Sequence, residues 1–409
     1  MGYHYEHLEA SDFSSALTEP QIIERISAID GVIDAKDALL QKLQPFMTRL
    51  LEAKHGEYEM PLTMFDKSIE ISKQMYDDPS YNETFIHNHE EQEYGGDLNS
   101  RRGGEYYTAE NYEDGAFTKE ILEAAQALGF VAPELPNTPT DPIDQKLGIA
   151  DSFLEPVEEE VEAVLVLTAK SISNPMRIRD TIRNIESGTV QTNRIVIASA
   201  TRVVDDEERQ KMNDLGLAVG NTEFESSIAS FNELAGTELS ASDAKTFSIT
   251  LNGREQEGLV LEKTVELATG PIELVVIAAP YDAQRVVAVK DGKPQYADRT
   301  NSQEALLAAE MFLSKDPGTI LLESHDVWTK SQAEATEQIL GVFGKQIIPA
   351  GPFKLDRLKV SQEGELVLNA PGQVVDEIAK TFLFATQTRL TMLNAREKLM
   401  RQLEALHES

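Results

Sequence analysis

The chain has 409 residues, no cysteine and a net charge of −33. This length exceeds that of a usual single domain and predicts two domains, each large enough to bury its own core. The absence of cysteine excludes disulfides, thiol nucleophiles and zinc–thiolate sites, and it is typical of the reducing cytoplasm. The strong negative charge disfavours nucleic acid and anionic lipid as partners.

The first residues, MGYHYEHLEASDF, lack the basic segment and following apolar segment of a secretory signal. No later run of about 18 apolar residues is present, as a membrane-spanning helix would need. We therefore expect a cytoplasmic protein with no membrane span. Residues 1–156 carry 31 acidic and 11 basic residues. This acid serves solubility or, alternatively, forms a face that meets a basic protein partner.

The N-terminal region is predicted to be mostly helical. Residues 18–54 form an amphipathic pattern that begins at Thr18, and Pro45 is a point at which this helix can break. Further helices are predicted at 61–76 and at 117–130, the last closed by Gly129. Residues 78–115 between them are poor in aliphatic side chains and predict a long flexible loop.

A proline-rich stretch, VAPELPNTPTDPIDQ at 131–145, has the composition of a linker. We therefore predict two domains: an acidic helical region at 1–150 that contains the 78–115 loop, and an α/β domain at 151–409.

Beyond residue 150, short apolar runs alternate with helical patterns, which predicts βαβ units around a mainly parallel, buried sheet. The expected fold is a three-layer, Rossmann-like α/β sandwich. The predicted strands are 162–169, 193–200, 272–279, 318–324 and 345–351. The predicted helices are 174–188, 205–216, 222–236, 300–314 and 326–344.

Two β-rich pieces interrupt this alternation. Residues 245–269, with a turn at Asn252-Gly253, and residues 356–370, with a turn at Glu363-Gly364, each predict an antiparallel hairpin attached to the parallel sheet. A long helix from residue 371 to the end is expected to pack on the core or on a partner helix.

Ser324, His325 and Asp326 are consecutive after one apolar run. They are not a catalytic triad, because neighbours at a strand end point opposite ways and no G-x-S-x-G turn is present. Instead we predict that Ser324 ends a strand and that Asp326 caps the next helix. The free N–H groups of that helix would then face the crevice where open α/β sheets bind ligands.

Other predicted strands also end in polar or basic side chains, among them Asn174, Thr201, Asp282 and Arg285. Helix N-termini and arginines both favour anions, so the sequence predicts a site for phosphate or carboxylate. The alternative for any one residue is that loop ends are generally polar. The candidate ligand-binding residues are Lys170, Ser171, Arg177, Ser199, Arg202, Asp298, Arg299, Thr300, Asn301, Ser324 and Lys330.

Local structure explains part of this set without a ligand. Thr300 or Asn301 can cap the helix that follows, and Glu304 stands where a capping box places its acid. Capping does not explain Arg299. His87 and His89 could chelate an ion if their segment were ordered, but a solvated loop is the favoured interpretation, so no metal site is predicted. Neither G-x-G-x-x-G nor a P-loop motif is present.

Five segments follow one another in a recognisable order: VLVLTA, MRIRDTIRNIESGTVQTNRIVIAS, DDEERQKMNDLG, ADRTNSQEALLAAEMF and TILLESHDVWTKSQAEA. In this order and spacing, residues 160–390 resemble the family that groups SanA, ElyC and YdcF. The resemblance implies a Rossmann-like three-layer sandwich. Members resemble cell-envelope-associated proteins, and one is similar to S-adenosylmethionine binders, so the resemblance admits S-adenosylmethionine as a cofactor.

Two functions remain open at the level of sequence. The first is binding of a small anionic, nucleotide- or phosphate-like molecule, with any reaction unspecified, and the basic strand ends favour it. The second is a non-catalytic interaction protein built on a decayed binding fold. It would meet a protein partner or a second copy through the acidic N-terminal region or the terminal helix. Val327 and Lys330 favour it, because the family is expected to have His and Arg there.

Overall fold

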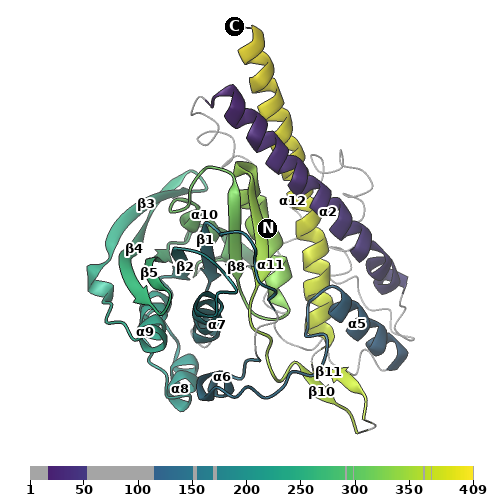
Figure 1. Ribbon diagram of the computed structural model, residues 1–409, viewed down its shortest axis with the longest axis vertical. Helices are drawn as coiled ribbons and strands as arrows, with labels where there is room; N and C mark the ends of the chain where they lie inside the picture. The colour runs from purple at the N-terminus through teal and green to yellow at the C-terminus, as the bar shows by residue number, and fades with distance from the viewer. Residues whose placement is uncertain are drawn as a thin grey trace.

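The computed structural model describes residues 17–52, 115–150, 154–168, 173–290, 293–297, 299–362, 364–369 and 371–408. A seven-stranded sheet forms its centre, in the order β3-β4-β5-β2-β1-β8-β9 (Figure 1). The five parallel strands are β1 (Ala163–Leu167), β2 (Arg194–Ala200), β5 (Gly270–Ala279), β8 (Gly318–Glu323) and β9 (Lys345–Ala350). Numbered along the chain, these strands lie in the order 3-2-1-4-5, the order of doubly wound dinucleotide-binding sheets.

Helices cover both faces of this sheet. Successive side chains of β1 point to opposite sides, so each face of the strand packs on a different pair of helices. Val164 and Val166 pack in a cluster with α7 (Asn174–Glu186) and α9 (Glu223–Ala235). Ala163 and Leu165 pack in a second cluster with α10 (Ser302–Glu310) and α11 (Trp328–Leu340). The predicted α/β three-layer sandwich with a mainly parallel sheet is therefore confirmed.

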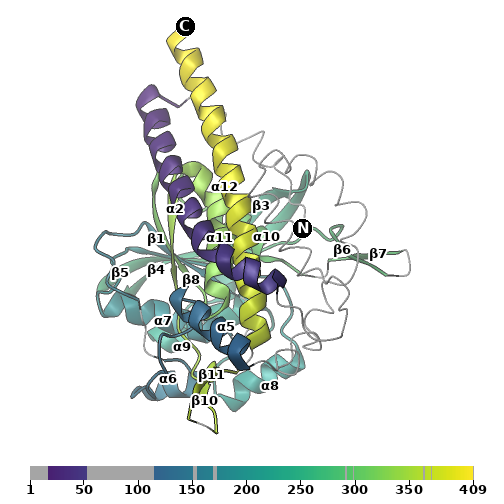
Figure 2. The same ribbon diagram turned by 90° about the vertical axis from the view of Figure 1, so that its right-hand side faces the viewer.

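A further helical layer lies outside α11. The long α12 (Pro371–Glu408) packs on α11, and α2 (Glu19–Glu52) runs antiparallel along α12, as Figure 2 shows. Asp30 pairs with Arg396 at 2.6 Å and Asp37 pairs with Arg389 at 2.5 Å, which fixes this direction. α5 (Gly115–Ala127) packs against the N-terminal half of α12. Among the helices that the structure describes, none is long and apolar enough to span a membrane.

The hairpin at one edge of the sheet is confirmed. β3 (Lys245–Leu251) and β4 (Arg254–Leu267) are antiparallel, and β4 pairs with β5. Asn252 and Gly253 both have positive φ, 50° and 71°, as the two central residues of a type I′ turn require.

Three expectations about local structure were wrong. Pro45 does not break α2, because the flanking Leu43 and Met47 are buried against α12 and α5 and hold the helix in place. The 131–145 linker contains most of a short helix, α6 (Pro142–Leu147), capped by Asp141 and closed by Gly148 at φ 66°. An Asp-Pro pair at the cap and first position is a helix-start signal that proline content obscured.

The third concerns the hairpin of β10 (Leu358–Val360) and β11 (Leu366–Leu368), which forms a sheet of its own rather than joining the central one. The chain leaves β9 and pairs residues 353–355 with residues 148–150, which carries the hairpin away from the sheet edge. The sequence did not predict the hairpin of β6 (Val286–Lys290) and β7 (Lys293–Tyr296). The remaining short elements are α8 (Asp206–Asp214), η4 (Ala241–Asp243) and η5 (Gly341–Phe343).

Of the helices that precede residue 150, α2 and α5 pack on α12, and α6 packs on α7. Both α12 and α7 belong to the predicted second domain. The predicted boundary near residue 150 stays a prediction. The second predicted helix, at 61–76, and the 78–115 loop lie outside the described residues.

Candidate functional site

The order of the parallel strands defines where a ligand site is expected. The chain passes from β1 to β2 and β5 on one side, and then to β8 and β9 on the other. Connections therefore leave in opposite directions at the carboxyl ends of β1 and β8. In doubly wound sheets this point is the crevice that binds ligands.

Arg177 of α7 lies across this point. Its Nη1 donates to the carbonyl of Leu167, the last residue of β1, and its Nε donates to Nδ1 of His325, two residues beyond β8, at 2.9 Å. The side chain is 1% exposed. Burial lowers the pKa of Arg177 to about 10, so the guanidinium stays charged at neutral pH. The two acceptors that it finds among the described residues are both uncharged.

His325 is held in one tautomer by this contact. An arginine only donates, so Nδ1 must be the acceptor and the neutral ring carries its proton on Nε2. Burial, followed by the charges of Arg177, Lys354 and Arg357, holds the pKa of His325 well below its usual range. The imidazole is therefore neutral at physiological pH. Its ring packs on Trp328 with centroids 4.9 Å apart.

Asp326 does not cap α11, contrary to the expectation from sequence. The helix begins at Trp328, and the position before it is Val327, which has no capping side chain. Asp326 has a φ of 30°, accepts from the Val327 N–H at 2.6 Å, and pairs with Arg357 through two nitrogens at 2.9 and 3.1 Å. The arginine, which follows β9, is a stronger partner for a buried carboxylate than a helix end.

Ser324 is also buried and bonds to groups inside the protein. Its side chain is fully buried, and its Oγ donates to Oε1 of Gln332 at 2.5 Å. Its backbone N–H donates to Ala350 of β9 at 3.0 Å. Among the described residues, no hydrogen bond joins the side chains of Ser324 and His325, as a catalytic triad would require.

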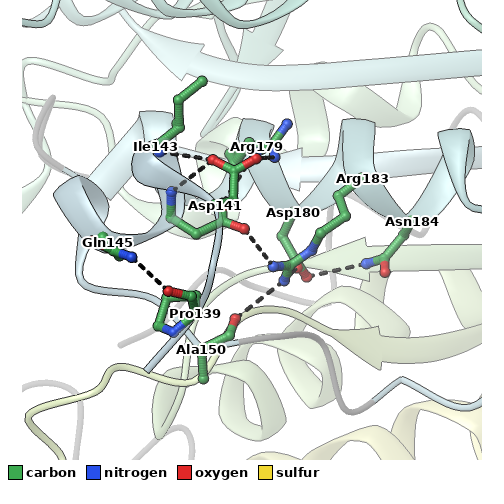
Figure 3. Close-up of polar contacts among 10 residues, drawn as sticks. Pro139, Asp141, Ile143, Gln145, Ala150, Arg179, Asp180, Arg183 and Asn184 are labelled. Atoms are coloured by element: carbon green, nitrogen blue, oxygen red, sulfur yellow. Dashed lines mark hydrogen bonds and ion pairs between the residues drawn. The ribbon is translucent and has the colours of Figure 1, made fainter. Parts of the chain in front are cut away.

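The second and third turns of α7 carry a dense polar network that extends toward α6 (Figure 3). Arg179 pairs with Asp141 at 2.8 Å and with Asp144 at 2.9 Å. Arg183 pairs with Asp144 at 3.0 Å and with Asp180 on its own helix. This network docks α6 on α7 and uses both of those arginines internally, so Arg177 is the basic residue of α7 that faces the strand ends.

Arg202, another candidate, lies just beyond the end of β2 and forms ion pairs with three acids. It pairs with Glu208 at 2.6 Å, with Glu223 at 2.7 Å and with Asp205 at 3.7 Å. Asp282 and Arg285 likewise have internal partners: Asp282 binds Arg254 at 3.0 Å, and Arg285 binds the fully buried Glu304 at 3.2 Å.

The smaller polar candidates form hydrogen bonds within the protein. Ser199 Oγ lies 3.2 Å from Ser227 Oγ, which also accepts from Asn174 at 3.1 Å. Thr300 donates to the Ala279 carbonyl, at the end of β5, at 2.8 Å. Asn301 caps α10 in a capping box with Glu304, as predicted.

The rest of the candidates lie elsewhere or cannot be placed. The backbone carbonyl of Arg299 accepts a hydrogen bond from Arg285. The positive charge of the Arg299 side chain acts on Glu223, near the end of β2. Lys330 lies in the helical layer, near Gly129, and burial lowers its pKa. Lys170, Ser171 and Asp298, together with His87 and His89, lie outside the described residues.

The structure thus brings Arg177 to His325, the residue after Ser324, at the end of β8, while the Ser324 side chain bonds Gln332 instead. Sequence reasoning missed Glu323, Asp180 and Arg357, which complete this group. A signal for Glu323 was present: it is the lone acid at the end of the apolar run TILLE. In the described part of the chain, no group of three or more His, Asp or Glu side chains is arranged to hold a metal ion.

No protein-family model matches this chain, and comparison with curated proteins and with solved structures also found no match.

Proposed function

We propose that the protein binds a small anionic ligand, of the nucleotide or phosphate kind, at the carboxyl ends of β1 and β8. Arg177 is the residue that would bind the anion. One observation carries this proposal: a fully buried guanidinium at the ligand crevice of a doubly wound sheet, with uncharged acceptors among the described residues. Asp326 and Glu323 act on this guanidinium only from a distance. A buried charge without a hydrogen-bonded counter-charge is costly, and an incoming oxyanion would supply one.

The groups around Arg177 suit an oxyanion. The neutral His325 carries a proton on Nε2, and the guanidinium offers several N–H donors in a fixed plane. Because Arg177 is 1% exposed, a ligand reaches it only when a neighbouring group moves. We therefore expect association slower than that of ordinary preformed sites.

A thermal-shift screen tests the proposal. Nucleotides, sugar phosphates and S-adenosylmethionine are the panel, the last because of the resemblance to the SanA, ElyC and YdcF family. A ligand at 100 times its dissociation constant stabilises the fold by about 2.7 kcal/mol, which a melting curve resolves. Arg177→Met should abolish the shift, whereas Arg202→Met should retain it because Arg202 already has three carboxylate partners. A shift that survives Arg177→Met would place the ligand elsewhere.

The alternative, a non-catalytic interaction or structural protein built on a decayed binding fold, is favoured by a separate observation. Arg202, Arg285 and Arg357 are all paired with carboxylates, so most cations near the strand ends have internal roles. On this alternative no compound in the panel changes the melting temperature, and the protein instead forms a complex with a partner or with itself. Light scattering over a range of concentrations measures the self-associating case.

A further inference from the structure

Glu323, the last residue of β8, is a buried acid to which the described residues offer no hydrogen-bond donor. Its side chain is fully buried, and neither carboxyl oxygen meets a hydrogen-bond donor among the described residues. It lies on the α7 side of the sheet, because Leu321, two residues earlier on the same strand, packs in the cluster that contains α7. An ionised carboxylate in such a place would lose its hydration with nothing to replace it.

Among the described residues, the titratable groups that face Glu323 all come from α7. They are Asp180, which lies within hydrogen-bonding reach, and the cations Arg177 and Arg183. The strands on either side contribute nothing titratable, since the register neighbours of Glu323 are Val166 on β1 and Ala350 on β9. The backbone at Gly351 also closes over the carboxyl, where a Cβ would stand 3.1 Å from Oε1.

Asp180 is an acceptor as well, and its oxygens are already engaged. One accepts from Arg183, and the other accepts from Asn184 at 3.1 Å. A second charge in the network, Asp144 of α6, adds to the negative field on Asp180. Two ionised carboxylates cannot hydrogen-bond to each other, so their contact requires a proton on one of them.

We infer that Glu323 and Asp180 hold one proton between them at neutral pH, and that this proton keeps Arg177 free of an internal ion pair. Burial and then the charge of Asp180 raise the pKa of Glu323 well above its usual range, and burial raises the pKa of Asp180. Loss of the proton would turn Glu323 into the carboxylate partner of Arg177. The second half of this inference rests on the proposed function: anion binding at Arg177 is then coupled to proton uptake by the carboxyl pair.

The sign of the pH effect follows from these raised pKa values. Above the ordinary carboxyl pKa the unfolded chain is deprotonated while the folded pair keeps its proton, so stability falls as pH rises toward the folded pKa. Glu323→Gln keeps the shape of the neutral acid and removes this proton. We expect its melting temperature to match wild type in mild acid and to exceed it increasingly at higher pH.

Glu334→Gln serves as the control, because Glu334 is a buried acid in a separate cluster between α2 and α11. Its effect and that of Glu323→Gln should add in the double variant. A Glu323→Gln melting curve that stays parallel to wild type from mild acid to mild base would overturn the inference. So would a stability gain that appears only in acid.

A direct measurement on unsubstituted protein guards against a variant that does not fold. With aspartate and glutamate labelled by carbon-13 at the side-chain carboxyl, NMR should show, besides Glu334, one carboxyl that is still protonated at neutral pH and that is absent in Glu323→Gln. If Glu323 and Asp180 are both ionised at neutral pH, the shared proton does not exist, whatever the ligand does.

The coupling to ligand has its own readout. With inorganic pyrophosphate as the probe, binding should weaken at least tenfold from neutral to alkaline pH in wild type, and Glu323→Gln should lose most of that dependence. Equal pH dependence in both proteins would overturn the coupling. If pyrophosphate does not bind at all, the coupling falls with the proposed function, but the NMR and melting results still decide the carboxyl pair.

Discussion

Single residues at the end of β8 are held by buried, charged partners that come from distant parts of the chain. Asp326 and Arg357 form such a pair, both nearly free of solvent contact. Replacing a buried ion pair as a whole can be neutral, but removing one partner leaves a charge that is neither hydrated nor compensated. The cost of a substitution here therefore depends on which charge remains.

Arg357→Ala tests this pair. The substitution leaves Asp326 buried without its guanidinium, and we expect a loss of about 3–5 kcal/mol in the free energy of unfolding. Urea unfolding followed by circular dichroism measures it. The control is Arg401→Ala, which removes an exposed ion pair with Glu397. Equal, small effects of the two substitutions would show that the Asp326–Arg357 pair contributes little.

Position 351 requires a glycine, because the Ser324 backbone fills the space where a side chain would begin. Its φ is 149°, and a Cβ would lie 2.2 Å from the Ser324 carbonyl oxygen. Gly351→Ala must therefore shift the backbone after β8 or after β9, at a cost of about 1–3 kcal/mol or more. Gly364→Ala is the matched control, because Gly364 also has positive φ, 84°, but open space around it. If chemical unfolding shows that Gly351→Ala and Gly364→Ala lose the same free energy of unfolding, the close contact between Gly351 and Ser324 would be contradicted.

At the scale of elements, α2 is joined to α11 by a buried cluster in which two acids bond one lysine and a second lysine, Lys330, acts on Glu334 from α11. Lys36 of α2 bonds Glu334 at 2.6 Å and Glu337 at 2.5 Å. Burial raises the pKa of Glu334 to about 7. Because this folded value exceeds the unfolded one, the proton on Glu334 stabilises the fold in acid, and that contribution is lost as pH rises through about 7.

Lys36→Met tests this cluster. Without Lys36, the two buried carboxyls lose the cation that they both bond, so we expect a loss of about 3–5 kcal/mol in mild base and a smaller loss in mild acid, where Glu334 is neutral. Unfolding by urea at the two pH values gives the comparison. Lys42→Met, on the exposed side of α2, should change little at either pH. A Lys36→Met effect that is independent of pH would contradict this role of Lys36.

At the scale of the whole molecule, the sequence predicted the layers better than the site. The five parallel strands were predictable because each is an apolar run of the length a buried strand needs, and the Asn252-Gly253 turn located the edge hairpin. The helix α6 was missed because proline content hid the Asp141 cap. Nothing local indicated that residues 353–355 pair with residues 148–150 and remove the second hairpin from the sheet.

The site was only partly predictable because its contacts join distant segments. Arg177 and His325 are 148 positions apart, and Asp326 meets Arg357 across a strand and a turn. Sequence position indicated that Arg177 and Arg202 both lie at strand ends, but it could not show that carboxylates from α8 and α9 engage Arg202. The balance of acids and bases at each strand end is a property of the folded molecule.

Calorimetric titration with pyrophosphate and with ATP is the most direct test of Arg177 as the anion-binding residue. One charge-assisted interaction contributes about 1.5–3 kcal/mol, so the account predicts that Arg177→Met weakens binding roughly 10- to 100-fold while Arg202→Met leaves it within about threefold. Equal affinity in wild type and Arg177→Met, or a larger loss in Arg202→Met, would contradict it.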